Sequence, residues 1–247
     1  MFYKSRRLVL GLFACSFLST AGAFTFTDDF SGTGPNAVWW TASASGGNTI
    51  VQTGGRIEVT QSHISGASGL GFNFPVYGDF EAQVDYALID WPMGNYERIG
   101  LGGSVFGAVE RSQHPGWFDE AYLTHFSVLG DGVYPTPTTD LQGTLRVVRS
   151  GSTVTGQYLK DGGWVDIHSL TNPAVAADTL VGFSVWNGYA SVPVRVAFDN
   201  FRLDAPAMAN PVPEPQTLVL LLIGLGIVGT VARRRGVGSA APPESAC

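Results

Sequence analysis

The carboxylates are the first residues whose types and spacing bear on chemistry. Glu81 and Asp85 point to the same face of one extended segment, yet four residues of strand separate them by roughly 13 Å. Hydrolysis of a glycosidic bond by two carboxyl groups needs them about 5 Å apart for retention and about 6.5–9.5 Å apart for inversion. We therefore expect this pair to form the solvated outer face of a strand.

The other nucleophiles and bases show no catalytic spacing either. The histidines are His63, His114, His125 and His168. They form neither an HxH nor an HExxH pattern, and no serine lies in a Gly-x-Ser-x-Gly elbow. The two cysteines, Cys15 and Cys247, lie close to the chain ends, so the segment between them has no thiol nucleophile and no zinc-thiolate site. These absences predict that the chain is not an enzyme and has no certain cofactor.

Aromatic side chains offer a different chemistry, because exposed rings can stack on sugars at a small entropic cost. The segment 90–122 is expected to be loop-rich, and loops commonly carry binding residues. The candidate glycan-binding residues are Trp91, Tyr96, Trp117, Tyr122 and Trp186. The alternative for each ring is a place in the core of an aromatic-rich domain.

Alternation of apolar and polar residues indicates the elements that must position these side chains. Phe80–Leu88 alternates strictly, as a half-buried strand does, and no stretch of the body keeps helical spacing over three turns. Glycine turns separate further strand pairs and predict hairpins. The predicted strands are Thr49–Thr53, Arg56–Thr60, Phe80–Leu88, Tyr122–Leu129, Leu145–Ser150, Thr153–Leu159, Trp164–Ser169, Leu180–Asn187 and Val194–Leu203. The pattern predicts an all-β body, an antiparallel β-sandwich or jelly roll.

Composition excludes several classes of protein. The chain has 247 residues, 45% hydrophobic and 14% charged, which argues against disorder. Its net charge is −6 and it has no basic stripe, so nucleic acid is not an expected partner. The body has 18 acidic and 8 basic residues, which favours solubility outside the cell.

Residues 1–23 have the three parts of a secretory signal peptide. Lys4, Arg6 and Arg7 precede an apolar run, and the small residues Ala21 and Ala23 mark the cleavage site for signal peptidase. The apolar run is well short of the ~20 residues that a membrane anchor needs. Lipoprotein processing at Cys15 is a weaker alternative, because the bulky Phe13 precedes it.

A second apolar segment, 217–232, predicts a short C-terminal transmembrane helix. Arg233, Arg234 and Arg235 follow it, and such a cluster stays cytoplasmic. The body would then face outward, and 236–247 would form a cytoplasmic tail. A buried core helix is the alternative, which the uniform lack of polar residues disfavours.

Val212, Pro213, Glu214 and Pro215 stand just before this span. The prolines fix the backbone in an extended form that a protease cleft can grip. A plain linker before an anchor is the alternative reading. The motif, the apolar span and the arginine cluster together resemble the PEP-CTERM sorting signal, here 211–235. That resemblance implies cleavage by an exosortase-like membrane protease in a Gram-negative bacterium, transient anchoring in the inner membrane, and delivery to the cell surface or the extracellular matrix.

The body, 24–210, resembles concanavalin A-like lectin/glucanase domains. The residues that carry the likeness are Phe26–Gly32, Gly78–Glu81, Leu145–Ser152 and Phe198–Phe201. In that group the first and last strands commonly pair, which would bring Asp28 and Asp29 near Asp199. These three carboxylates would then be candidate ligands of a structural calcium ion, with solvated turn caps as the alternative.

Three functions fit these expectations. The first is an exported surface or matrix protein with a non-catalytic sandwich associated with extracellular polysaccharide. The second is a hydrolase or lyase of the same fold, although the Glu-x-Asp carboxylate pattern of related glucanases is absent. The third is a structural envelope protein without a ligand. The sequence favours the first.

Overall fold

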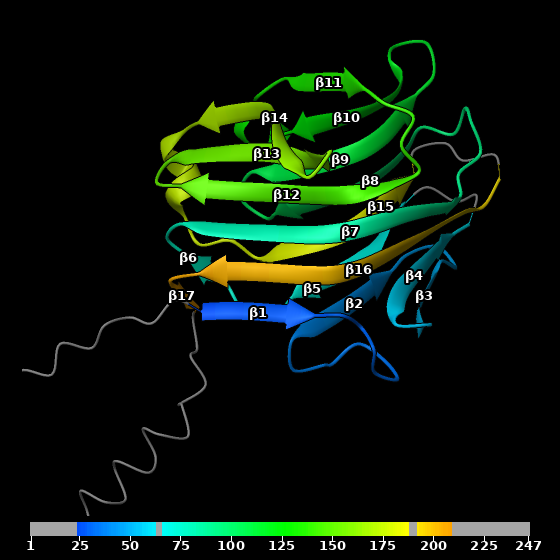
Figure 1. Cartoon of the computed structure of the whole chain (residues 1–247), viewed down its shortest axis with the longest axis horizontal. Coiled ribbons are helices and arrows are strands. Elements are labelled where there is room, and N and C mark those ends of the chain that lie inside the picture. The colour runs from blue at the N-terminus through cyan, green and yellow to red at the C-terminus, as the bar shows by residue number, and fades with distance from the viewer. Residues whose placement is uncertain (1–23, 63–65, 188–191, 209–247) are drawn as a thin grey trace, which may run out of the picture.

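The computed structural model describes residues 24–62, 66–187 and 192–208, which form a two-layered antiparallel β-sandwich (Figure 1). One sheet has eight strands in the order β14-β13-β12-β7-β16-β4-β3, with β1 also paired to β16. Its members are β1 (Phe24–Asp28), β3 (Thr49–Thr53), β4 (Arg56–Gln61), β7 (Phe80–Asp90), β12 (Gln142–Ser150), β13 (Thr153–Lys160), β14 (Gly163–Thr171) and β16 (Val194–Ala205). The predicted fold class is confirmed.

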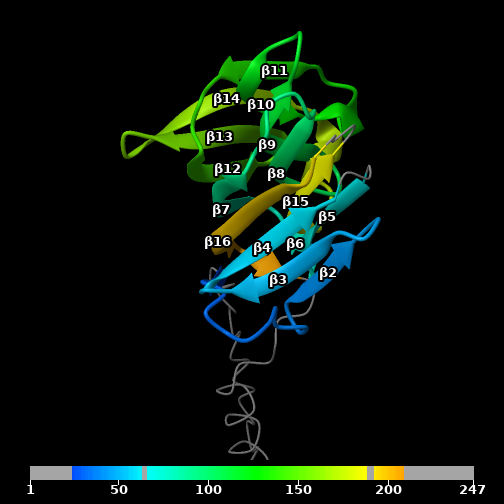
Figure 2. The ribbon, with the colours of Figure 1, turned by 90° about the vertical axis from the view of Figure 1, so that its right-hand side faces the viewer.

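The second sheet has seven strands in the order β11-β10-β9-β8-β15-β5-β2. Its members are β2 (Trp40–Ala44), β5 (Gly66–Phe72), β8 (Glu97–Gly103), β9 (Gly107–His114), β10 (Asp119–His125), β11 (Val133–Pro137) and β15 (Val181–Asn187). The strand β11 lies at one end of the sandwich and β2 and β3 lie at the other in both views (Figure 1, Figure 2). A small pair, β6 (Val76–Tyr77) with β17 (Ala207–Met208), and two short 3-10 helices, Ser127–Leu129 and Pro173–Ala176, complete the described part.

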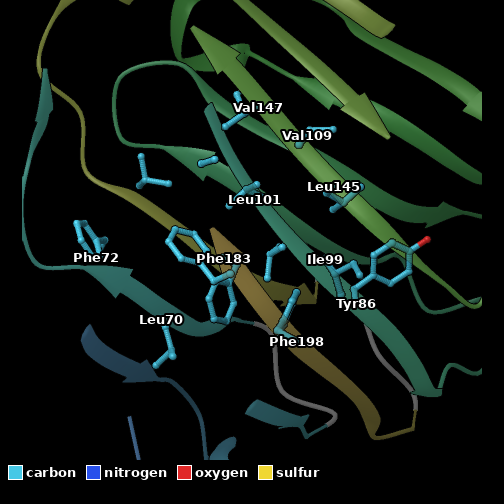
Figure 3. Close-up of a cluster of buried hydrophobic side chains, with 14 of the residues drawn as sticks. Leu70, Phe72, Tyr86, Ile99, Leu101, Val109, Leu145, Val147, Phe183 and Phe198 are labelled. Carbon is cyan, nitrogen blue, oxygen red and sulfur yellow. The ribbon is translucent and has the colours of Figure 1, made fainter. Parts of the chain in front are cut away.

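The core lies between the two sheets, where their alternating inner residues interdigitate (Figure 3). On β7, Phe80, Ala82, Val84, Tyr86 and Leu88 are buried, as the alternation predicts. The facing residues from the seven-stranded sheet include Leu70, Ile99, Leu101, Val109 and Phe183. Burial of this apolar surface is the main favourable term in the stability of the sandwich.

The predicted strands are correct apart from their ends, with one exception. The predicted strand Tyr122–Leu129 is wrong in its second half, because β10 ends at His125 and the chain turns into the 3-10 helix Ser127–Leu129. The helix ends at Gly130, whose φ of 76° is left-handed and suits glycine. The expectation of a loop-rich segment 90–122 is also wrong, since it contains β8, β9 and the start of β10.

The expected pairing of first and last strands is confirmed. The strand β1 runs antiparallel to β16, with Asp28 opposite Phe201. No helix in the described ranges is long and apolar enough to cross a membrane. The signal peptide 1–23 and the predicted transmembrane helix lie outside the described residues.

Candidate functional site: a groove on the seven-stranded sheet

An open groove runs over the outer face of the seven-stranded sheet. A hollow of about 660 Å³ lies over β8, β9, β10 and β15, and a second of about 510 Å³ continues it toward β5 and β2. The two hollows share Ala67, Arg98, Glu110, His125 and Trp186. These shared residues mark the centre of the groove.

The floor of the groove is made of small residues. Gly69 and Gly71 of β5, Gly102 of β8, and Gly182 and Ser184 of β15 line it. Cross-strand register explains why they gather, because Gly182 lies opposite both Gly71 and Gly102. A floor without large side chains leaves room for an extended ligand to approach the backbone.

Three titratable or charged side chains meet at the centre from three neighbouring strands. Arg98 of β8, Glu110 of β9 and His125 of β10 all point to the outer face. Arg98 Nη1 lies 3.4 Å from Glu110 Oε1 and 2.6 Å from His125 Nδ1. His125 Nδ1 lies 3.6 Å from the same Glu110 oxygen. We call these three residues the Arg98 cluster.

Glu110 is the buried member of this cluster. Its side chain is 3% exposed, whereas those of Arg98 and His125 are 33% and 32% exposed. Its second oxygen, Oε2, is buried without a hydrogen-bond partner. Arg98 and His125 are therefore the members that a ligand can contact, and Glu110 holds them in place.

Trp186 gives the groove an aromatic surface beside the cluster. It lies opposite Arg98 in the β15–β8 register, and the Arg98 guanidinium carbon is 5.4 Å from its ring centroid. Gly100 makes this arrangement possible. A Cβ there would lie 2.9 Å from both Glu110 Cγ and the Val109 carbonyl oxygen, closer than real Cβ atoms approach, and 3.0 Å from Trp186 Cζ3.

A group of rings forms one end of the groove. His114 packs edge-on against Tyr96, with 4.8 Å between centroids, and against Trp117, with 5.3 Å. Phe118 packs on Trp117 at 4.9 Å. Trp117 is 57% exposed, so its ring is accessible to a ligand.

A buried acid lies on the inner side of the same strand. Glu97 of β8 is fully buried, and neither carboxylate oxygen has a hydrogen-bond partner. Burial raises the pKa of its carboxyl to about 8. Glu97 is therefore mainly neutral at pH 7 and does not face the groove.

The five residues predicted to bind glycan are placed differently. Tyr96, Trp117 and Trp186 line the groove. Trp91 instead packs against the core and its indole nitrogen is buried without a partner. Glycan contact by these residues remains a prediction.

Tyr122 is a correction, because its ring lies in the core and not on the surface. It is 1% exposed and stacks on Tyr158 at 4.2 Å. Its hydroxyl donates to Asp140 Oδ2 at 3.0 Å and accepts from the Tyr86 hydroxyl at 2.7 Å. Burial raises the pKa of both tyrosines, that of Tyr86 to about 12.

The predicted calcium ligands are close to one another but engaged in turn hydrogen bonds. Asp28 accepts from the Phe30 backbone N–H at 2.9 Å and from Trp40 Nε1 at 2.8 Å. Burial raises the pKa of Asp199, and the charges of Asp85 and Asp29 act in the same direction. In the described ranges no group of three or more acidic, histidine or cysteine residues is placed to hold a metal. A calcium-dependent rise in melting temperature that Asp199→Ala abolishes remains the check on that prediction.

The sequence did not single out the Arg98 cluster. Arg98, Glu110 and His125 lie on three different strands, and only the register of β8, β9 and β10 brings them together. Residues 110–114 of β9 are all polar, so no alternation in this stretch assigns Glu110 to the outer face. The expected solvated face of Glu81 and Asp85 is seen on β7, where Glu81 pairs with Arg146 at 3.2 Å.

The comparisons with known proteins divide the chain in two. Residues 211–235 match the model of the PEP-CTERM protein-sorting motif, which contains the predicted residues 212–215 and 233–235. This motif implies export and processing by an exosortase. No curated protein has a significantly similar sequence.

Several solved structures similar to the body are described as enzymes that act on glycans, and others as proteins of unknown function. One, described with endo-acting O-glycanases of human gut bacteria that initiate mucin breakdown, has 12% identity and a TM-score of 0.56, covering 73% of this chain and 98% of its own. A β-1,3-glucanase from Mycobacterium marinum has 12% identity and a TM-score of 0.52, covering 72% and 97%. A LamA variant from Zobellia galactanivorans, in complex with laminaritriose and laminaritetraose, has 12% identity and a TM-score of 0.54, covering 72% and 97%.

These structures overturn the prediction that the chain is not an enzyme. That prediction relied on a missing carboxylate pattern, whereas this fold carries glycan-cleaving activity in its structural neighbours. At 12% identity the likeness establishes the fold, and the chemistry has to be argued from the groove itself. The chain thus carries a PEP-CTERM sorting motif at 211–235 and a body that is an antiparallel β-sandwich.

Proposed function

We propose that this chain is an exported glycan-processing protein of the bacterial surface or matrix, which binds polysaccharide along the groove and acts on it at the Arg98 cluster. The observation that carries the proposal is the meeting of a cation, a buried carboxylate and an imidazole at the centre of an open, glycine-floored groove. Three accessible rings in the same groove support a carbohydrate ligand.

The Arg98 cluster is suited to acid–base chemistry. Arginine only donates hydrogen bonds, so His125 Nδ1 accepts from it and the imidazole proton sits on Nε2. That is the neutral ring. A charged imidazole, with Nδ1–H directed at Glu110 Oε1 3.6 Å away, can pass its Nε2 proton to a leaving oxygen and become neutral. In the described residues that line the groove, Glu110 is the one carboxylate, so a two-carboxylate hydrolysis is not favoured.

Turnover of polysaccharides tests this role. Purified protein is incubated with a panel of glycans, and new reducing ends and unsaturated ends are both measured. His125→Gln is expected to lower turnover by about 10²- to 10⁴-fold. His168→Gln is the matched control, because His168 contacts Asp131 and Tyr134 away from the groove and should leave turnover unchanged. Equal turnover by His125→Gln and the parent protein would contradict the proposal.

The destination of the protein is tested separately. We propose that the C-terminal segment anchors the chain transiently and that cleavage near Val212–Pro215 releases the body outward. Cell fractionation and intact mass compare the parent chain with Glu214→Ala. A product ending near the motif, found outside the inner membrane and lost in Glu214→Ala, is the expected result. An uncleaved product in the inner membrane in both strains would contradict it.

A further inference from the structure

The guanidinium of Arg98 has an unused edge. Both of its hydrogen bonds within the described part of the chain use Nη1, to Glu110 and to His125. The group is one third exposed and lines both hollows of the groove. Nε and Nη2 are therefore available together, and this planar pair matches the two oxygens of a carboxylate or sulfate.

The charges around the groove favour the same kind of ligand. Arg98 is the one lysine or arginine among the described residues that line it, and its single carboxylate, Glu110, already faces Arg98 and His125. On the eight-stranded sheet Arg146 pairs with Glu81 and Arg195 with Asp90, and in the groove Arg98 pairs with Glu110 through Nη1 alone. The acidic body repels an acidic polymer in general, and the free edge of Arg98 is where the groove offers an acidic group a charged hydrogen-bond donor.

The aromatic surface lies where it can hold the sugar ring that bears the acidic group. Trp186 lies beside Arg98, and Trp117 stands exposed at one end of the same hollow. Arg98 lies over the Trp186 ring, so a pyranose ring would contact the part of Trp186 that Arg98 leaves uncovered, with its substituents within reach of the free edge of Arg98. Neutral glycans would use the rings alone and leave that edge unpaired.

We propose that the substrate class of the groove is an anionic polysaccharide, whose carboxylate or sulfate groups bind the Nε–Nη2 edge of Arg98 while its sugar rings contact Trp186 and the exposed Trp117. This inference rests on the proposed function, because it names the ligand of the same groove.

Binding to three glycans tests the proposal. Calorimetry on the purified protein uses a polyuronate oligosaccharide, a sulfated glucan and a neutral β-glucan. Arg98→Gln is expected to weaken binding of an anionic glycan by about tenfold or more. Arg98→Lys should weaken binding less, because it keeps the positive charge but loses the planar pair of N–H donors. Arg146→Gln is the matched control. Arg146 also lies over a tryptophan, 4.4 Å from the Trp164 centroid, but on the other sheet.

The outcomes separate the substrate class from the function. Anionic binding that falls in Arg98→Gln and persists in Arg146→Gln supports the proposal, and the polyuronate and sulfate arms tell which group is bound. Preferential binding of the neutral glucan, unchanged in Arg98→Gln, overturns the anionic class and leaves the proposed function standing. Absence of binding to every glycan overturns both. Thermal melting of each variant shows whether loss of binding comes from loss of the fold.

Discussion

Arg98 Nη1 lies 2.6 Å from His125 Nδ1, so a cation and an imidazole from two strands that are not neighbours share a hydrogen bond. β9 lies between those strands and supplies Glu110, whose carboxylate lies within 3.6 Å of both partners. The three strands thereby hold the imidazole in one tautomer at the centre of the groove. Preorganisation of this kind is what an acid–base site requires.

The tautomer of His125 is the first prediction. Nitrogen chemical shifts at neutral pH are expected to show His125 with its proton on Nε2, because Nδ1 accepts from Arg98. In Arg98→Gln this preference should weaken. A proton found on Nδ1 in the parent protein would mean that the cluster is arranged differently in solution.

The fit of Trp186 over Gly100 gives a second prediction. Gly100→Ala is expected to displace Trp186 and Glu110 and to weaken glycan binding by about tenfold, because its Cβ would lie about 3 Å from both side chains. Gly34→Ala is the control outside the groove, since a Cβ there meets nothing within 4 Å. Titration of each variant with glycan measures the effect. Equal binding by the two variants would show that Trp186 is not held by this packing.

Burial of Glu97 gives a third prediction, on the pH dependence of stability. Its pKa is about 8 when folded, against 4.5 when exposed, so the folded state holds one more proton between these values. The free energy of unfolding therefore falls as pH rises from about 5 to about 8, by up to about 1.4 kcal/mol per pH unit. Glu97→Gln should remove this fall and raise the melting temperature most at pH 8–9.

A glutamate on the other sheet controls for this prediction. Glu81 is half exposed, and Glu81→Gln should leave the pH profile of the parent protein in place. Chemical denaturation at several pH values measures both variants. A pH profile that Glu97→Gln does not flatten would show that the carboxyl is hydrated or paired when the protein is folded.

The tyrosine pair in the core gives a fourth prediction. Tyr122→Phe removes the hydroxyl that links Tyr86 to Asp140 and leaves both without that partner. The free energy of unfolding is expected to fall by about 1–3 kcal/mol. Tyr134→Phe loses one exposed contact to Asp131 and should change it by less than about 0.5 kcal/mol. Denaturant titration measures the free energy of unfolding of both variants. Equal losses would show that the buried hydroxyl network stabilises the fold no more than the exposed contact does.

Local patterns in the sequence were enough to predict every strand of the eight-stranded sheet except β1, but only β10 and β15 of the seven-stranded sheet. The turn at Gly54-Gly55 and the alternation from Phe80 to Leu88 are local features, and β3, β4 and β7 follow them closely. The side on which Tyr122 points could not be predicted, because Ala121, Tyr122 and Leu123 are all apolar and give no alternation. The structure buries the ring.

The site was beyond prediction for a related reason. Arg98, Glu110 and His125 come together through the register of β8, β9 and β10, which pairs Gly100 with Glu110 and Ala108 with His125. The strand β15 then adds Trp186 beside Arg98 from far along the chain. Register between strands depends on the whole packed sandwich, so spacing along the sequence carries little information about it.

The position of a bound glycan tests the central claim most directly. Indole N–H resonances are recorded during titration with an anionic oligosaccharide, using His125→Gln so that the ligand is not consumed. The groove account predicts that Trp186 and Trp117 shift, while Trp164 on the opposite sheet and the buried Trp40 stay in place. Shifts confined to Trp164, with Trp186 unmoved, would contradict the account by placing the glycan on the eight-stranded sheet.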